Sequence, residues 1–238
     1  MNIGICGYGK MGKSIEKIAV KRGHNIIFTS NNINTIKLNK LKIDVVVEFS
    51  NPKSAFNNIT HCLNNHIPIV SGTTGWLDRL PDAKKLCTQT KGTFVHATNF
   101  SIGMHTMFMI NNISSKLINN DIYNLCIEET HHTEKKDIPS GTAITLAKST
   151  CSNIDKFKSW QSMKEGLKIP SSKIPIWSYR KKNNIGEHHI KYKSDNDEIT
   201  ISHKSLNRDG FSTGAVIAAE FIQFKTGFFT MSEIIKNL

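Results

Sequence analysis

The N-terminal segment restricts the fold more than any other part of this sequence, because strand-like and helix-like patterns alternate there around a glycine-rich turn. Residues 1–6 are mostly apolar and lead directly into Gly7-Tyr8-Gly9-Lys10-Met11-Gly12. Apolar residues at helical spacing follow over residues 13–22, and residues 25–29 form a second apolar segment. This order predicts a strand, a turn, a helix and a parallel strand, since parallel strands need a crossover between them.

The same alternation continues through the N-terminal half of the chain. Further strands are expected at residues 44–49, 67–70 and 93–96, with helices between them at about 52–65 and 82–90. Repeated strand–helix units form a parallel sheet that is covered by helices on both faces. The sequence therefore predicts an α/β protein whose N-terminal domain is a doubly wound, Rossmann-like sheet.

The pattern changes near residue 100, where apolar and polar residues begin to alternate as in a sheet with one solvated face. Such strands are expected at residues 122–129, 188–193 and 198–203. Helices are expected at 104–118, 141–151 and 214–224, whereas the stretch from 152 to 179 contains Lys, Ser and Pro and is expected to be largely loop. These segments predict a second α+β domain with an open mixed sheet.

Two domains follow from this change of pattern. Residues 1–102 are expected to form a dinucleotide-binding domain, completed by residues 208–238. Residues 103–207 are expected to form a substrate-binding and oligomerisation domain. A chain of 238 residues is long enough for two modest domains.

Three segments at predicted strand ends are suited to a nicotinamide cofactor. The G-x-G-x-x-G spacing from Gly7 to Gly12 allows close approach of the backbone to a pyrophosphate at a helix start. Ligands of doubly wound sheets bind at the carboxyl ends of strands, where this chain has Gly72, Thr73, Thr74 and Thr98, Asn99, Phe100, Ser101. The alternative for each segment is a tight turn without a ligand.

The end of the second strand bears on the choice between NADH and NADPH. A carboxylate at this position would bind the ribose 2′-hydroxyl of NAD. Residues 30–32 are Ser-Asn-Asn, with neither an acid nor an arginine. We expect either cofactor to bind, with a slight preference for NADPH because nothing there repels a phosphate.

The segment from Glu128 to Thr142 carries the highest density of reactive groups. His131 and His132 leave a strand, Lys135 follows, and Ser140-Gly141-Thr142 opens a helix. Histidine exchanges a proton near neutral pH, and backbone N–H groups at a helix start bind carboxylates. Together they predict a pocket for a small anion that must also receive a proton.

The residues alone also allow interpretations of this segment that involve no catalysis. A histidine pair can lie on a surface, a Lys-Lys pair is usually solvated, and Pro-Ser-Gly-Thr is a good helix start. Zinc held by Glu128 and His131 is another alternative, but there is no H-E-x-x-H and no nearby cysteine pair. We therefore expect no metal.

The net charge of +12 raises the question of a nucleic-acid partner. The lysines are spread in singles and pairs, with no run of five like charges. No apolar stretch approaches the ~18 residues that span a bilayer, and the five cysteines are isolated. We expect neither a nucleic acid nor a membrane as partner, and a reducing, cytoplasmic location.

The stretch from Glu129 to Ala143 resembles the signature E-x-H-H-x-x-K-x-D-x-P-S-G-T-A of the 4-hydroxy-tetrahydrodipicolinate reductase family. The glycine turn, Gly72-Thr73-Thr74-Gly75, Asn99-Phe100-Ser101 and Gly186-Glu187-His188 are similar to family segments in the same order. The C-terminal part fits as well, at His203, Arg208, Phe211, Gly214 and Ala215. One departure is the first turn, where the family spacing G-x-x-G-[RK]-M-G places Cys6 at the first glycine.

This resemblance implies NADPH- or NADH-dependent reduction of a cyclic imine dicarboxylate in the diaminopimelate route of lysine biosynthesis. It implies that His131 is the general acid/base, that Lys135 is a proton donor or electrostatic partner, and that His132, Ser140, Gly141 and Thr142 hold the substrate carboxylates. It also implies a homotetramer. The rival hypotheses are another Rossmann-type amino-acid dehydrogenase and a non-catalytic dinucleotide-sensing or nucleic-acid-binding protein.

Overall fold

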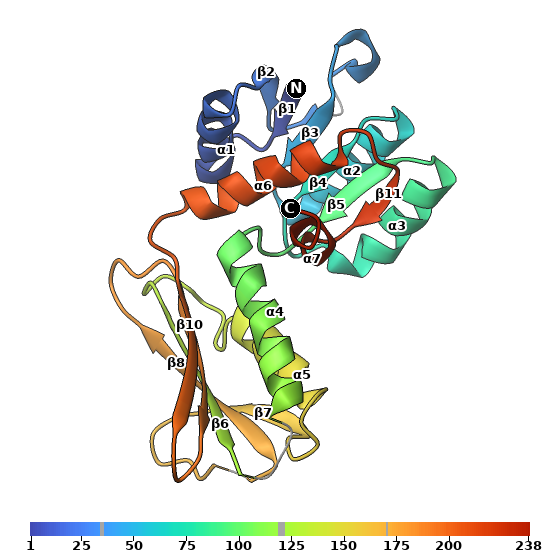
Figure 1. Cartoon of the computed structure of the whole chain (residues 1–238). Coiled ribbons are helices and arrows are strands. Elements are labelled where there is room, and N and C mark those ends of the chain that lie inside the picture. The colour runs from blue at the N-terminus through green and yellow to red at the C-terminus, as the bar shows by residue number, and fades with distance from the viewer. Residues whose placement is uncertain (34–35, 119–121, 170) are drawn as a thin grey trace. The chain divides into compact units, whose positions relative to one another are not determined.

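The chain folds into two units, seen in a computed structural model that describes residues 1–33, 36–118, 122–169 and 171–238 (Figure 1). The first unit comprises Met1–His105 and Arg208–Leu238, and the second comprises Thr106–Asn207. The first junction therefore lies within helix α4 (Ile102–Leu117), three residues after the expected boundary at residue 102.

The first unit is built on a parallel sheet of six strands in the order β11-β5-β4-β3-β1-β2. This is the doubly wound arrangement that the sequence predicts, extended by a C-terminal strand. The strands are β1 (Asn2–Cys6), β2 (Asn25–Ser30), β3 (Val45–Glu48), β4 (Ile69–Ser71), β5 (Thr93–His96) and β11 (Gly227–Phe229).

Helices cover both faces of this sheet, which explains why β3, β4 and β5 are buried along their whole length. One face packs with α1 (Lys10–Lys21) and α6 (Asp209–Ile222) around a core that includes Ile5, Ile15 and Ala218. The other face packs with α2 (Pro52–Asn64) and α3 (Leu80–Gln89) around a core that includes Ile59 and Phe94. Short elements complete the unit: η2 (Leu38–Lys40), η3 (Leu77–Arg79) and α7 (Met231–Ile235).

The strand register brings the candidate cofactor segments to one edge of the sheet. Cys6 at the end of β1 pairs with Glu48 at the end of β3, Glu48 pairs with Ser71, and Ser71 pairs with His96. The turns that follow these residues therefore leave the sheet side by side, at the carboxyl ends of its strands.

The second unit contains a mixed sheet of five strands in the order β10-β9-β6-β8-β7. Strand β8 runs parallel to its neighbours β6 and β7, whereas β9 and β10 are antiparallel additions. Helix α5 (Gly141–Cys151) and the part of α4 that follows His105 belong to this unit. The strands are β6 (Asn124–His131), β7 (Ser159–Ser162), β8 (Lys173–Arg180), β9 (Glu187–Lys193) and β10 (Glu198–Lys204).

The expectation that residues 152–179 are largely loop misses two strands, because β7 and most of β8 lie there. Strand β7 is only half-buried and has the polar sequence Ser-Trp-Gln-Ser. Strand β8 contains Pro175, a residue that usually argues against a central strand. The parallel pairing of β8 with β6 is a tertiary effect that local propensity does not reveal.

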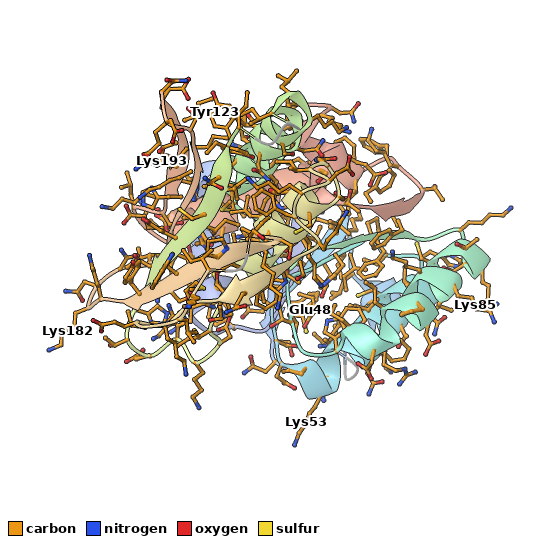
Figure 2. The ribbon with its side chains drawn as sticks, turned by 90° about the horizontal axis from the view of Figure 1, so that it is seen from below. Glu48, Lys53, Lys85, Tyr123, Lys182 and Lys193 are labelled. Carbon is orange, nitrogen blue, oxygen red and sulfur yellow. The ribbon has the colours of Figure 1, made fainter. Side chains whose placement is uncertain are left out.

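The basic charge is dispersed over separate elements. Lys53 in α2, Lys85 in α3 and Lys182 after β8 point their ammonium groups outward, whereas Glu48 lies among the ribbons (Figure 2). Within the described residues, no helix is both long enough and apolar enough to cross a bilayer.

Candidate active site

The turn between β1 and α1 requires glycine at two of its positions. Gly7 has a φ of +92°, and a Cβ there would lie 2.1 Å from the carbonyl oxygen of Phe49. A Cβ on Gly12 would lie 2.2 Å from the carbonyl oxygen of Gly7. Gly9, by contrast, faces open space and begins α1 without a side-chain cap. The helix start therefore leaves backbone N–H groups available to an anion, as a pyrophosphate site requires.

The rest of this turn is tied to the end of β2 and to helix α1. The Tyr8 N–H donates to Asn31 Oδ1 at 3.0 Å, and the Tyr8 hydroxyl donates to Glu16. Lys10 is exposed at the helix start, and Met11 is half-buried. The amide side chain of Asn31 thus holds the glycine turn against the strand end where a ribose would be recognised.

Glu48 organises a second turn and was not singled out from the sequence. Its fully buried carboxylate accepts hydrogen bonds from the hydroxyls of Ser50, Ser71 (2.6 Å) and Thr73 (2.8 Å) and from the Ser50 N–H (3.0 Å). The Ser50 N–H also reaches the Thr73 hydroxyl at 2.9 Å. One buried acid therefore links the turn after β3 to the Gly72–Thr74 segment after β4.

Phe49 connects the same region to the remaining cofactor segment. A Cβ on Gly72 would fall 2.1 Å from the Phe49 ring, so the ring packs directly on that glycine. The Phe49 ring also lies 5.5 Å from that of Phe100, centroid to centroid. Ser101 donates its N–H to Asn99 Oδ1 at 2.8 Å, which closes the turn after β5. Thr74 and Thr98 are exposed on this edge of the first unit.

The second unit contains a buried Glu129–His131 pair at the end of β6. Both residues are less than 9% exposed, and the Nδ1 atom of His131 is hydrogen-bonded to a carboxylate oxygen of Glu129. Burial alone raises the pKa of the Glu129 carboxyl, but the hydrogen bond with His131, followed by a hydrogen bond with Ser178, the charge of His131 and a hydrogen bond with Arg180, outweighs it and lowers that pKa from 4.5 to about 2. The pair therefore contains a carboxylate that orients one nitrogen of the imidazole and leaves the other for proton exchange.

The remaining oxygen of Glu129 is also occupied. Its Oε1 accepts from Arg180 Nη1 at 3.1 Å and from the N–H of Ser140 at 3.3 Å. Ser140 is the N-cap of α5, and its hydroxyl accepts from the N–H of Ala143 at 3.2 Å. Glu129 thus joins the candidate acid/base to the start of the helix that carries Gly141 and Thr142.

A second histidine packs against this pair from β9. The rings of His188 and His131 meet edge to face, with centroids 5.0 Å apart, and His188 Nε2 lies 3.1 Å from the Ser140 hydroxyl. Burial, followed by the charge of His131, lowers the pKa of His188 from 6.5 to about 3. His188 is therefore neutral near pH 7 and supports the His131 ring without competing for a proton.

Lys135 and His132 lie in the turn that follows β6. The Lys135 ammonium donates to Asp137 Oδ1 at 2.8 Å. Partial burial favours the neutral Asp137 carboxyl, but the hydrogen bond with Lys135 outweighs it and lowers the pKa of that carboxyl below 3.8. His132 Nδ1 is buried and has no hydrogen-bond partner within the part of the chain that the structure describes. A buried polar atom without a partner is expected where a ligand supplies the missing bond.

Glu129, His131 and His188 also have donor atoms within 4.8 Å of one another, a spacing that a metal ion can bridge. The surroundings disfavour that use. Glu129 already carries the guanidinium of Arg180 at 3.1 Å, and a divalent cation would be added next to this fixed positive charge.

The structure therefore joins His131 and Ser140 through Glu129, and Arg180 connects Glu129 to the backbone carbonyl of Lys135, whose ammonium pairs with Asp137. A Cβ on Gly141 would meet no atom of the described residues within 4 Å, so the surroundings of its Cα are uncrowded. Sequence reasoning missed the linking role of Glu129, and it missed Arg180 and Glu48 altogether. A charged residue at the end of a strand was the only signal available for each of them.

Comparison with known proteins agrees with this architecture. The profile described as "Dihydrodipicolinate reductase, C-terminus" matches residues 103–235, and "Dihydrodipicolinate reductase, N-terminus" matches residues 19–100. The glycine turn at residues 7–12 precedes the N-terminal match, in line with its unusual spacing.

Individual relatives are named 4-hydroxy-tetrahydrodipicolinate reductase. The 4-hydroxy-tetrahydrodipicolinate reductase of Christiangramia forsetii is 42% identical over 100% of this chain and 99% of its own length. That of Buchnera aphidicola subsp. Schizaphis graminum is 32% identical over 95% of this chain and 83% of its own length. The solved structure described as dipicolinate-bound dihydrodipicolinate reductase from Paenisporosarcina sp. TG-14 has a TM-score of 0.80 at 22% identity and covers 97% of both chains. The chain belongs to the dihydrodipicolinate reductase family.

Proposed function

We propose that this oxidoreductase catalyses the NAD(P)H-dependent reduction of (2S,4S)-4-hydroxy-2,3,4,5-tetrahydrodipicolinate to tetrahydrodipicolinate, in the diaminopimelate route of lysine biosynthesis. The curated relatives are named for this reaction, and one of them is 42% identical over the whole chain. The single structural observation that carries the proposal is the buried Glu129–His131 pair beside the start of α5. It provides an oriented proton-exchanging group next to a site for carboxylates.

His131 is the proposed general acid/base. The reaction adds a hydride and a proton to a conjugated cyclic imine and releases water, so a proton must be delivered beside the ring. Glu129 fixes Nδ1 of His131, and the opposite nitrogen is the one that can exchange a proton with the substrate. A nearby acid of this kind contributes roughly 10²–10⁴-fold to a rate.

The substrate is a dianion, and the second unit offers several groups that suit it. We propose that Lys135 supplies positive charge or a proton, while His132, Ser140, Gly141 and Thr142 hold the carboxylates. The position of these residues at the start of α5 supports this, because the N-terminus of a helix favours negative charge. The pairing of Lys135 with the Asp137 carboxylate supports it too, because the ammonium already accommodates an oxyanion.

The first unit is proposed to bind the cofactor, whose reduced nicotinamide supplies the hydride. The proposed contacts are Gly7, Tyr8, Gly9, Lys10, Met11 and Gly12 for the pyrophosphate, and Gly72, Thr73, Thr74, Thr98, Asn99, Phe100 and Ser101 for the nicotinamide half. The uncapped start of α1 and the shared sheet edge support this assignment. We propose that NADH and NADPH both serve, with a slight preference for NADPH, because Asn31 and Asn32 carry no charge.

The decisive experiment is a coupled assay. The hydroxy-dipicolinate intermediate is supplied, and the loss of reduced nicotinamide is followed by its absorbance. We expect turnover with either cofactor, at least tenfold slower turnover for His131→Gln at unchanged cofactor affinity, and loss of both turnover and substrate binding for Lys135→Ala. Absence of turnover in the wild type, or a near-normal rate in the Lys135 variant, contradicts the proposal.

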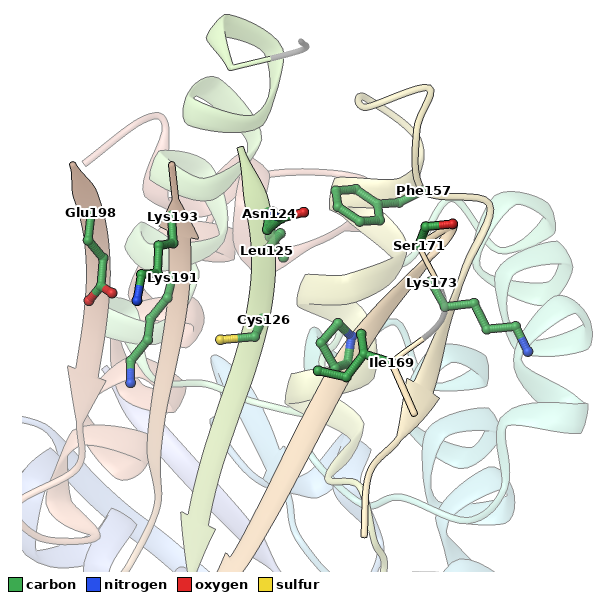
Figure 3. Close-up of a pocket in the computed structure, with 11 residues that line it drawn as sticks. Asn124, Leu125, Cys126, Phe157, Ile169, Ser171, Lys173, Lys191, Lys193 and Glu198 are labelled. Carbon is green, nitrogen blue, oxygen red and sulfur yellow. The ribbon is translucent and has the colours of Figure 1, made fainter. Parts of the chain in front are cut away.

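We also propose a cytoplasmic homotetramer assembled through the solvated face of the second sheet. All five cysteines are free thiols, which supports a reducing compartment. That sheet carries a pocket of about 500 Å³ beside Leu125, Phe157 and Lys191 (Figure 3). Light scattering should give four times the 26.7 kDa chain mass; a monomer at micromolar concentration contradicts this assembly.

A further inference from the structure

Arg180, the last residue of β8, makes more polar contacts around the proton-transfer cluster than its position in the sequence suggests. Its Nη1 donates to Glu129 Oε1 at 3.1 Å, and its Nη2 donates to the carbonyl oxygen of Asp137 at 2.7 Å. Its Nε donates to the carbonyl oxygen of Lys135 at 3.3 Å. One guanidinium therefore contacts both the carboxylate that orients His131 and the turn that carries Lys135.

The sheet itself aims this side chain. Strands β6 and β8 are parallel neighbours, and His131 is paired in register with Arg180. The N–H of Lys181 donates to the carbonyl oxygen of His131 at 2.8 Å, so the two strand ends are also fastened through the backbone. The Arg180 side chain is only 15% exposed, and Glu129 is fully buried, so solvent screens their interaction weakly.

We propose that Arg180 is a positioning residue for proton transfer, which holds His131 through Glu129 and Lys135 through the backbone of residues 135–137. The inference rests on the proposed roles of His131 and Lys135. Arg180 itself exchanges no proton, because its guanidinium stays charged at any pH at which the enzyme folds. Its contribution is to fix the distance between two groups that act on the same substrate.

The geometry requires arginine in particular. Three separate nitrogen atoms of one plane reach three acceptors that come from β6 and from the following turn. A lysine ammonium is a single point charge and cannot span these acceptors, although it would keep the charge beside Glu129. The two substitutions Arg180→Lys and Arg180→Ala thus separate the effect of charge from the effect of the planar fork.

The charge also sets the pH range of activity. Arg180 places a positive charge beside the carboxylate that is hydrogen-bonded to His131. Removal of this charge should move the pH profile of kcat toward higher pH. A residue with a merely structural role would lower the amount of folded enzyme and leave the profile where it is.

The test uses the full-length enzyme with saturating cofactor and substrate. Arg180→Ala should lower kcat by roughly 10²-fold at unchanged cofactor affinity, a loss typical when an orienting partner of a functional group is removed. Arg180→Lys should keep the pH profile of the wild type but still lose at least ~10-fold in kcat, because it retains charge without the fork. Millimolar guanidinium should restore part of the activity of Arg180→Ala.

The matched control is Arg22→Ala in the first unit, which removes another arginine–glutamate pair, made with Glu220 at 2.7 Å. It should leave kcat, the pH profile and the response to guanidinium unchanged. A kcat within threefold of the wild type for Arg180→Ala overturns the inference, as does an unshifted pH profile without rescue. Arg180→Lys provides the kcat test if the alanine variant does not fold.

A separate readout distinguishes this inference from the proposed function. If the wild type itself does not reduce the hydroxy-dipicolinate intermediate, the proposed function fails. The ring-nitrogen NMR signals of His131 then still report on Arg180. We expect them to shift in Arg180→Lys and not in Arg22→Ala; unshifted signals in both would overturn the positioning role.

Discussion

Two buried glutamates organise the two units of this enzyme in different ways. Glu48 ends β3 in the first unit, Glu129 lies near the end of β6 in the second, and both side chains are fully buried. The acceptors of Glu48 are filled by hydroxyl groups and one backbone N–H. Glu129 instead meets the imidazole of His131 and the guanidinium of Arg180.

The difference lies in what each carboxylate does with its partners. Hydroxyl and amide donors fix the direction of each bond, so Glu48 sets the shape of the turns at residues 50 and 71–73. Glu129 acts through charge as well, since its partners lower its pKa to about 2 despite complete burial. We infer that the first unit needs geometry from its buried acid, whereas the second unit needs both geometry and negative charge.

The sharpest test of this difference is Glu129→Gln. The amide keeps the size of the side chain but removes the negative charge, so Arg180 is left without its counter-ion and His131 loses a strong acceptor. We expect kcat to fall by roughly 10²–10³-fold with cofactor affinity unchanged. Steady-state kinetics and cofactor titration measure the two quantities.

Glu128→Gln is the matched control for that variant. Glu128 is the adjacent residue on the same strand, but it is 29% exposed and pairs with Lys191 at 2.8 Å. Exposed ion pairs contribute about 0–1 kcal/mol, so this change should alter kcat by less than about threefold. Equal losses in the two glutamine variants would mean that buried charge at Glu129 has no special role.

Glu48→Gln should affect the cofactor unit alone. The NH₂ group of the glutamine side chain can only donate, so at least one of the hydroxyls of Ser50, Ser71 and Thr73 loses its acceptor. A lost buried hydrogen bond costs about 1–3 kcal/mol, which corresponds to roughly tenfold weaker cofactor binding if the turns shift. Calorimetric titration with NADPH measures this loss, and kcat at saturating cofactor should stay within about threefold.

Glu220→Gln serves as the control in the first unit. Glu220 lies on α6 and pairs with Arg22 and His24 rather than with a strand-end turn. It should leave the cofactor affinity unchanged. Weaker substrate binding together with normal cofactor binding in Glu48→Gln would contradict the separation of roles between the two acids.

Much of this arrangement could be predicted from sequence because it is local. The βαβ unit has a glycine turn with helical spacing after it, and the residues from Glu129 to Ala143 form one continuous signature. The expected parallel sheet and the second mixed sheet are both confirmed. The roles assigned to His131, Lys135 and the turn residues remain predictions that the variants above test.

The parts that sequence reasoning missed depend on contacts between distant residues. Arg180 reaches Glu129 across 51 residues of chain, from a strand whose Pro175 and polar neighbours suggested a loop. Glu48 closes an apolar strand, and its partner Thr73 is 25 residues away. Only the register of the sheets brings these groups together, and periodicity does not determine which strands become neighbours.

Gly186 offers a smaller perturbation of the substrate unit. A Cβ at this position would lie 3.2 Å from Nε2 of His131, the nitrogen that Glu129 leaves for proton exchange. Gly186→Ala should press the ring away from its position. Mild overpacking costs about 1 kcal/mol, so kcat should fall several-fold. Gly166→Ala, at a glycine with open space around it, is a poor control because its φ is +82°, so Gly210→Ala is preferred. Unchanged kcat in Gly186→Ala would show that the ring can move without loss of function.

The mildest test separates the units by their stability at acid pH. The folded-state pKa of His188 is about 3, below the 6.5 of the unfolded chain, because burial disfavours the imidazolium. Between these values the unfolded chain binds more protons, so the free energy of unfolding falls as pH drops from 6.5 toward 3, with a slope of at most about 1.4 kcal/mol per pH unit for this group. Glu129 adds to the loss of stability only below its ordinary pKa of 4.5, as the pH approaches 2.

Urea unfolding of His188→Asn should therefore show a shallower dependence of the unfolding free energy on pH between pH 6 and pH 4.5 than the wild type. His96 in the first unit has a pKa lowered to about 4, again mainly by burial, and provides the comparison. The prediction fails if His96→Asn flattens the dependence of stability on pH and His188→Asn does not. The neutral histidine that matters for folding would then lie in the first unit. The packing of His188 against His131 would have to be explained by its effect on turnover alone.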